Sequence, residues 1–126
     1  MKNTAIKGKY VPKNTNKFSA KDAIYRSLWE RRFMLYCDRN KNILEWSSEN
    51  IVIPYTHPKD NKLHNYYPDF YIKYINVHGN TVEKIIEIKP KWQCNWSVNR
   101  AKWIACRKAC KQWGYKFQVL TEKELF

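Results

Sequence analysis

Residues 66–91, YYPDFYIKYINVHGNTVEKIIEIKPK, constrain the fold more strongly than any other stretch of the chain. The pattern predicts a β-hairpin, with one strand after Pro68, a turn at HGN and a return strand that ends at Pro90. Side chains alternate along a strand, so the adjacent Ile85 and Ile86 make the return strand apolar on both faces. Such a strand is typical of the covered centre of a sheet.

The segments around this hairpin predict helices and further strands. Asp22 can cap a helix that runs to about Cys37, and Ser97 can cap a second helix that Gly114 closes. The other expected strands are residues 43–46, 51–55, where Pro54 indicates an edge, and 115–122. This order favours an α/β fold, a mixed central sheet flanked by helices in the order αβββαβ.

The chain of 126 residues suits one compact domain, which we place at residues 21–126. Hydrophobic residues make up 44% of it and aromatic residues 16%, enough for a real core. Residues 1–20 are instead rich in Lys and Asn, and we expect them to form a basic, loosely ordered arm.

Carboxylates stand among the apolar residues of both hairpin strands. Glu87 and Lys89 share one face of the return strand, and Asp69 begins the first strand at the end where Glu87 leaves the sheet. A Glu87–Lys89 ion pair would be sufficient for one buried acid, but one lysine does not neutralise two. Mg²⁺, which binds through one or two carboxylates, water and phosphate, would compensate both acids and activate a phosphodiester, with Mn²⁺ as a substitute. The lysine would then hold the attacking water or stabilise transition-state charge.

The spacing of Pro68-Asp69 and Glu87-Ile88-Lys89 resembles the signature of the PD-(D/E)xK nuclease superfamily. The resemblance implies a restriction-endonuclease-like core. It also implies that Glu30, on the first helix, completes the metal site with Asp69 and Glu87, and that Lys89 is the catalytic lysine. The alternative for Glu30 is a helical pair with Arg26, worth only about 0.3–0.5 kcal/mol.

Lys102 is singled out by its position on the second helix. It falls in the middle of an arc of apolar residues, whereas the other basic residues of the helix lie on the opposite side. Its stem could simply cover apolar surface while the ammonium stays in water. Our hypothesis is that Lys102 reaches the acidic site as a second catalytic cation.

Longer stretches of the sequence resemble a narrower group of proteins within this superfamily. YRSLWERRFMLYCD, EWSSENIVIPY, YYPDFYI and VLTEKEL are similar to the head completion nucleases of T-even-type tailed phages, from about Tyr25 to Leu125. A more distant resemblance, to the N-terminal catalytic domain of a Tn7-type transposase subunit, concerns only the nuclease core. The resemblance to this family implies that the protein acts on packaged DNA ends before tail joining. It also implies that the protein acts in the host cytoplasm during assembly or at the virion head-neck region, with portal or neck proteins as partners.

The net charge of +13 makes a polyanion the expected partner. No apolar run approaches the length of a membrane span, and the basic residues are spread along the chain, so we expect double-stranded DNA and no membrane. The candidate DNA-binding residues are His64, Lys91, Trp92, Arg100, Arg107, Lys108 and Lys111. His64 could equally be an ordinary loop residue. Trp92 and Trp96 could stack on splayed bases or pad the core.

Other chemistries fit less well. Cys106 and Cys110 could hold zinc together with Cys94, but without a CxxC pair the four cysteines are better interpreted as buried thiols. An RNA-binding module lacks its usual aromatic signature. The main alternative to a magnesium-dependent endonuclease or end-trimming nuclease is a structural DNA-binding plug that cleaves nothing. Such a plug has no use for Asp69 and Glu87 together, because both would weaken phosphate binding.

Overall fold

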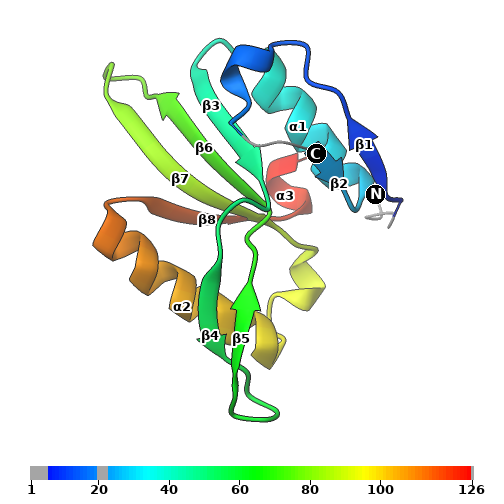
Figure 1. Ribbon diagram of the computed structural model, residues 1–126, viewed down its shortest axis with the longest axis vertical. Helices are drawn as coiled ribbons and strands as arrows, with labels where there is room; N and C mark the ends of the chain where they lie inside the picture. The colour runs from blue at the N-terminus through cyan, green and yellow to red at the C-terminus, as the bar shows by residue number, and fades with distance from the viewer. Residues whose placement is uncertain (1–5, 20–22, 126) are drawn as a thin grey trace.

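The computed structural model describes residues 6–19 and 23–125. It contains a mixed sheet of four strands in the order β3-β6-β7-β8, in which β7 and β8 are parallel and the other neighbours antiparallel. Figure 1 shows α1 on one side of this sheet and α2 on the other. The strands are β1 (Gly8–Tyr10), β2 (Ala23–Tyr25), β3 (Ile43–Ser48), β4 (Ile53–Thr56), β5 (Leu63–Tyr66), β6 (Phe70–Ile75), β7 (Thr81–Ile88) and β8 (Lys116–Leu120). The helices are α1 (Leu28–Arg39), α2 (Ser97–Trp113) and α3 (Glu122–Leu125), with short 3₁₀ turns η1 (Thr15–Lys17) and η2 (Lys91–Gln93).

The predicted hairpin is confirmed as β6 and β7, and β7 is a central strand. The side chains of β7 belong to two hydrophobic cores, one on each face of the sheet. Ile86 and Ile88 pack with Trp29, Phe33 and other residues on the α1 face. Ile85 packs with Trp103 and other residues on the α2 face. The alternation expected from the sequence therefore sets which face of the sheet Glu87 occupies.

The first helix begins later than predicted. It starts at Leu28, where the hydroxyl of Ser27 accepts a hydrogen bond from the Glu30 backbone N–H at 3.2 Å. Residues 23–25, expected to be helical, form β2 instead, because they pair with β1 and bury Ala23. The predicted cap, Asp22, lies outside the described residues.

Residues 6–19, the described part of the segment that we expected to form a loosely ordered arm, contain β1 and η1 in the structure. Tyr10 is buried in the α1-side core, and its hydroxyl donates a 2.6 Å hydrogen bond to Asp38. Lys17 donates to backbone carbonyls at the end of α1, including that of Asn40 at 2.8 Å. Residues 1–5 and 20 lie outside the described residues.

A second hairpin, β4–β5, stands apart from the main sheet and packs against α2 (Figure 1). The sequence predicted β4 and its edge position but missed β5. Buried thiols at Cys37, Cys106 and Cys110 are confirmed. No helix among residues 6–19 and 23–125 is long and apolar enough to cross a membrane.

Candidate active site

A pocket of about 540 Å³ collects side chains from five separate parts of the chain, around the ends of β3, β5 and β7 and the first half of α2. Asp69, Glu87, Lys89 and Lys102, all singled out from the sequence, line it together. The other lining residues are Arg26, Glu49, Asn65, Tyr66 and Tyr67. The α2 side of the sheet thus carries three acids and three cations in one hollow.

Strand register brings the two acids together. Phe70 of β6 pairs with Ile86 of β7, so Asp69, one residue before, lies where β7 continues through Glu87. The Ile88 backbone N–H donates a 2.7 Å hydrogen bond to Oδ2 of Asp69. This bond fixes the Asp69 carboxylate against the end of β7.

The environment of Asp69 opposes its negative charge. Burial raises the pKa of this carboxyl well above its ordinary value, and the charges of Glu87 and Glu30 raise it further. The hydrogen bond from Ile88 and the ammonium of Lys89 act in the opposite direction but do not cancel the effect. A cation placed between the acids would relieve this repulsion.

Glu87 is only 4% exposed. Its Oε2 lies 3.8 Å from Nζ of Lys89, so the predicted ion pair is present, although loose. Its Oε1 is buried without a hydrogen-bond partner among the described residues. A buried carboxylate oxygen without a partner is costly, and it has room for a ligand that the protein itself does not supply.

Glu30 does not line the pocket. Its carboxylate accepts hydrogen bonds at the start of α1, from the Arg26 backbone N–H at 3.3 Å and the Ser27 hydroxyl at 3.2 Å. Burial nevertheless raises the pKa of Glu30, and the charges of Glu49 and Glu87 add to the shift. Glu30 is therefore close enough to act electrostatically on the other acids, but its oxygens are occupied by the helix terminus.

Lys102 reaches the pocket from α2. Its Nζ lies 5.6 Å from the ring centre of Tyr66 and 5.9 Å from that of Tyr55. These rings hold the ammonium by cation–π attraction on the same side of the sheet as Glu87. Its position in the apolar arc of the helix thus reflects a side chain that points toward the pocket.

Sequence reasoning missed one pair in the pocket. The guanidinium of Arg26 binds both carboxylate oxygens of Glu49, at 2.7 and 3.1 Å. Glu49 has φ of 49°, a left-handed conformation that is unfavourable for a residue other than glycine or asparagine. The run SSEN suggested only a turn, and nothing in it signalled that its glutamate would face Arg26 across 23 residues.

The donor set fits a hard divalent cation at Asp69 and Glu87: the first acid is partly buried and has a raised pKa, and the second is buried and has an unpartnered oxygen. Within the described parts of the chain, no group of three or more His, Cys, Asp or Glu side chains is arranged to hold a metal ion. The expected three-carboxylate set is thus not assembled, because Glu30 turns to its own helix terminus.

Six of the seven candidate DNA-binding residues divide into two groups. Lys91, Trp92 and Arg100 lie just beyond the pocket, around η2 and the start of α2. Trp92 and Trp96 are 68% and 46% exposed with their rings 5.3 Å apart, so neither pads the core. They form an aromatic pair on the surface, three and seven residues after Lys89.

The second group follows the exposed side of α2. Lys108 and Lys111 are exposed, and Arg107 lies over the ring of Phe117 at 5.4 Å. His64 differs from both groups, since it sits on β5, pairs with Asp60 at 2.8 Å and does not line the pocket.

The fold and the pocket define a restriction-endonuclease-like protein, and comparison with known proteins agrees. Residues 40–122 match the model of the TnsA-like endonuclease N-terminal family, and the chain belongs to this family. It is also 34% identical to the head completion nuclease of Enterobacteria phage T4, over an alignment that covers 96% of this chain and 94% of that protein. The family match spans β3 to β8 and includes Asp69, Glu87, Lys89 and Lys102.

Proposed function

We propose that this protein is a divalent-metal-dependent deoxyribonuclease that hydrolyses phosphodiester bonds in the pocket of Asp69, Glu87 and Lys89. The observation that carries the proposal is the buried, unpartnered oxygen of Glu87 beside a second acid of raised pKa. Two such acids oppose DNA binding unless a cation joins them, and a chain of net charge +13 has no other need for them.

Asp69 and Glu87 are the residues that would hold the metal, Mg²⁺ or Mn²⁺ in its place. When bound, the metal supplies Lewis-acid activation of the phosphate and of water. Lys89, which already contacts Glu87, orients the attacking water or stabilises charge that develops on the phosphate. Lys102 adds a second cation from α2. Glu30 supports the site electrostatically and becomes a direct ligand only if it leaves Ser27.

The DNA path follows from the cations around the pocket. Lys91 and Arg100 lie near the site, while Arg107, Lys108 and Lys111 extend the contact along α2 through phosphates. Trp92, together with Trp96, stacks on bases that leave the duplex. His64 is a peripheral phosphate contact from β5.

The biological setting comes from the relative in phage T4, whose name describes a head completion nuclease. We infer the same role for this chain, with packaged DNA ends as substrate before tail joining. It would then act in the host cytoplasm during assembly or at the head-neck region of the virion, with portal or neck proteins as partners.

The first test is plasmid nicking. Supercoiled DNA is incubated with the wild type or with Asp69→Ala, in Mg²⁺, Mn²⁺ or EDTA. We expect cleavage by the wild type with a divalent ion and none in EDTA or by the variant. If both proteins bind DNA equally and neither cuts it, the structural plug replaces the nuclease.

A further inference from the structure

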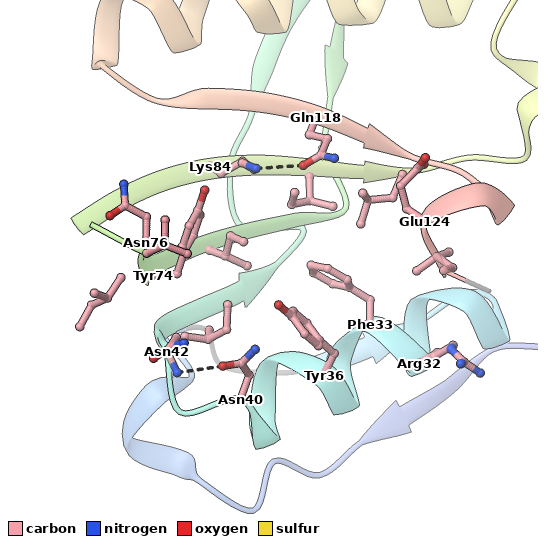
Figure 2. A pocket seen from close by; sticks show the side chains of 17 residues that line it. Arg32, Phe33, Tyr36, Asn40, Asn42, Tyr74, Asn76, Lys84, Gln118 and Glu124 are labelled. Atoms are coloured by element: carbon pink, nitrogen blue, oxygen red, sulfur yellow. Dashed lines mark hydrogen bonds between the residues drawn. The ribbon is translucent and has the colours of Figure 1, made fainter. Parts of the chain in front are cut away.

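A second hollow lies on the opposite face of the sheet from the acidic pocket. It measures about 750 Å³ and opens between α1, α3 and the sheet strands β6, β7 and β8 (Figure 2). Its lining includes Ile72, Ile86 and Leu120, which also belong to the α1-side core. We call this hollow the α1 groove. No step of the proposed nuclease reaction uses it.

The floor of the α1 groove is apolar and continues onto exposed surface. Phe33 and Ile86 lie in it, while Tyr36 at its margin is 52% exposed and Val77 is 96% exposed. A phosphate backbone gains nothing from aliphatic side chains, so this face does not fit DNA. A continuous apolar hollow with exposed margins is typical of a protein interaction site.

Cations flank the floor. Figure 2 shows Lys84 and Arg32 at different ends of the groove. Lys116 pairs with Lys84 in the parallel register of β7 and β8, so two lysines of neighbouring strands share one face. Glu124, the acid among the lining residues, already accepts hydrogen bonds from the backbone N–H and hydroxyl of Thr121. The groove therefore presents positive charge to an incoming partner.

Two other occupants fit poorly. A second copy of this chain would carry a net charge of +13 to a positive face, which opposes self-association. A small polar ligand would need polar groups gathered at the floor, yet the floor is apolar and Asn40 at its margin already accepts from the Asn42 backbone N–H at 2.8 Å. What remains is an apolar floor beside the two lysines of β7 and β8.

We propose that the α1 groove docks an amphipathic, acidic segment of another protein, with aliphatic side chains on the floor and Asp or Glu toward Lys84 and Lys116. A helix laid in a groove is a common form of such recognition. The site does not depend on the nuclease reaction, because the sheet separates the groove from Asp69 and Glu87.

The test is selection of 12-residue peptides from a random displayed library against the full-length protein, at physiological salt. We expect enriched sequences with apolar residues at helical spacing and acidic residues between them. Their affinity should fall about tenfold, or roughly 1.4 kcal/mol, in Tyr36→Ala and in Lys116→Glu. Both side chains are exposed, so the variants should fold. Trp113→Ala, an exposed aromatic on α2, is the matched control and should change nothing.

Scrambled peptides of the same composition separate docking from simple attraction to a basic protein. If they bind as well as the originals, or if enriched peptides are basic or insensitive to the groove variants, the proposal is wrong. Sedimentation that reveals a dimer lost in Tyr36→Ala would overturn it in favour of a second copy. All variants should nick plasmid DNA like the wild type. The peptide assay therefore tests the docking proposal, and the nicking assay tests the nuclease proposal independently.

Discussion

Asp69 illustrates at the scale of single residues how the proposed activity opposes stability. A carboxyl whose pKa is raised by folding destabilises the fold at any pH above its unfolded value, because the folded state disfavours the charge. The cost grows as the pH rises through the unfolded pKa toward the folded one and is constant above it. The acid is kept in place although it costs free energy, which is expected of a functional group.

Asp69→Asn should therefore raise stability and abolish cleavage. The amide oxygen can still accept the hydrogen bond from Ile88 while the charge is lost. We expect Tm at pH 8 to rise by roughly 3–6 °C, the effect of about 1 kcal/mol in a domain of this size. The gain should narrow as the pH falls toward 4. Thermal unfolding across this range measures it, and an equal gain at every pH would contradict the assignment.

Mg²⁺ provides the control for this variant. If Asp69 and Glu87 share a cation, Mg²⁺ should raise the Tm of the wild type and leave that of Asp69→Asn almost unchanged. A rise of the same size in both proteins would place the metal elsewhere.

A substitution at Lys102 can separate the effect of the position of the side chain from the effect of its charge. Lys102→Met keeps most of the stem on Tyr55 and Tyr66 but removes the ammonium. We expect cleavage to fall about 10- to 100-fold with Tm nearly unchanged, and Lys102→Arg to recover part of the loss. Single-turnover cleavage and DNA affinity are measured together. If both are unchanged in Lys102→Met, the lysine only covers apolar surface.

Much of the candidate site could be predicted from the sequence because its acids lie on one hairpin. Period-two alternation placed Glu87 and Lys89 on one face, and the register of a short hairpin placed Asp69 beside them. Arg26 and Glu49 could not be predicted, since their pairing depends on how β2 and β3 end in space. The hydrogen bonds of Glu30 at its own helix terminus were equally invisible.

At the scale of elements, the N-terminal segment and the end of α1 are joined by Asp38. This carboxylate is 1% exposed and accepts hydrogen bonds from the Tyr10 hydroxyl and from the backbone N–H groups of Lys13 and Asn14. Burial alone would raise its pKa, but these hydrogen bonds hold the pKa below its ordinary value. The ionised form of Asp38 therefore fastens residues 10–14 to the helix.

Asp38→Asn should loosen this junction. Hydrogen bonds to a charged group contribute about 1.5–3 kcal/mol, and an amide can replace only part of the set, so we expect a loss of about 2 kcal/mol at neutral pH. Because the folded pKa is depressed, this stability is present above the unfolded pKa and disappears as the pH falls through the folded one. Urea unfolding at pH 7 and pH 3 should show a larger difference between the proteins at pH 7 than at pH 3.

Hydrogen exchange gives the local control. In Asp38→Asn, amide protection should fall first in β1 and at the end of α1, while β6 and β7 stay protected. Uniform loss across the sheet would show that the junction is not a separate unit.

The elements that sequence patterns missed are short strands defined by their pairing partners. The run AIY after Asp22 continues a helical pattern, yet it becomes β2 because β1 lies beside it. LHNY, too polar to predict a strand, becomes β5 through pairing with β4. The hairpin of β6 and β7 and the helix α2 were predicted because their apolar periodicity is local, whereas a short polar strand that is held by its pairing partner leaves little trace in its own residues.

At the scale of the whole molecule, the central sheet separates two surfaces of different chemistry. The α2 side carries the acidic pocket, the exposed tryptophan pair and the basic residues of the helix. The α1 side carries the apolar groove. Net charge alone could not distinguish these sides, because lysines lie on both. If DNA runs along α2, only the cations on the α2 side should contribute to the affinity for DNA. The remaining cations of this chain of net charge +13 should not.

This division predicts a difference between two exposed lysines. Lys108 lies on α2 and Lys116 begins β8 with its side chain toward the α1 face, as its pairing with Lys84 requires. In Lys108→Ala, the slope of log K against log salt for duplex DNA should fall by about 0.9, the value for one lost phosphate contact. Lys116→Ala should leave the slope unchanged. Titration of a fluorescent duplex between about 50 and 200 mM salt resolves such a change. Equal decreases of this slope in the two variants would mean that DNA contacts both faces of the sheet. The α1 groove would then not be a site for a protein partner alone.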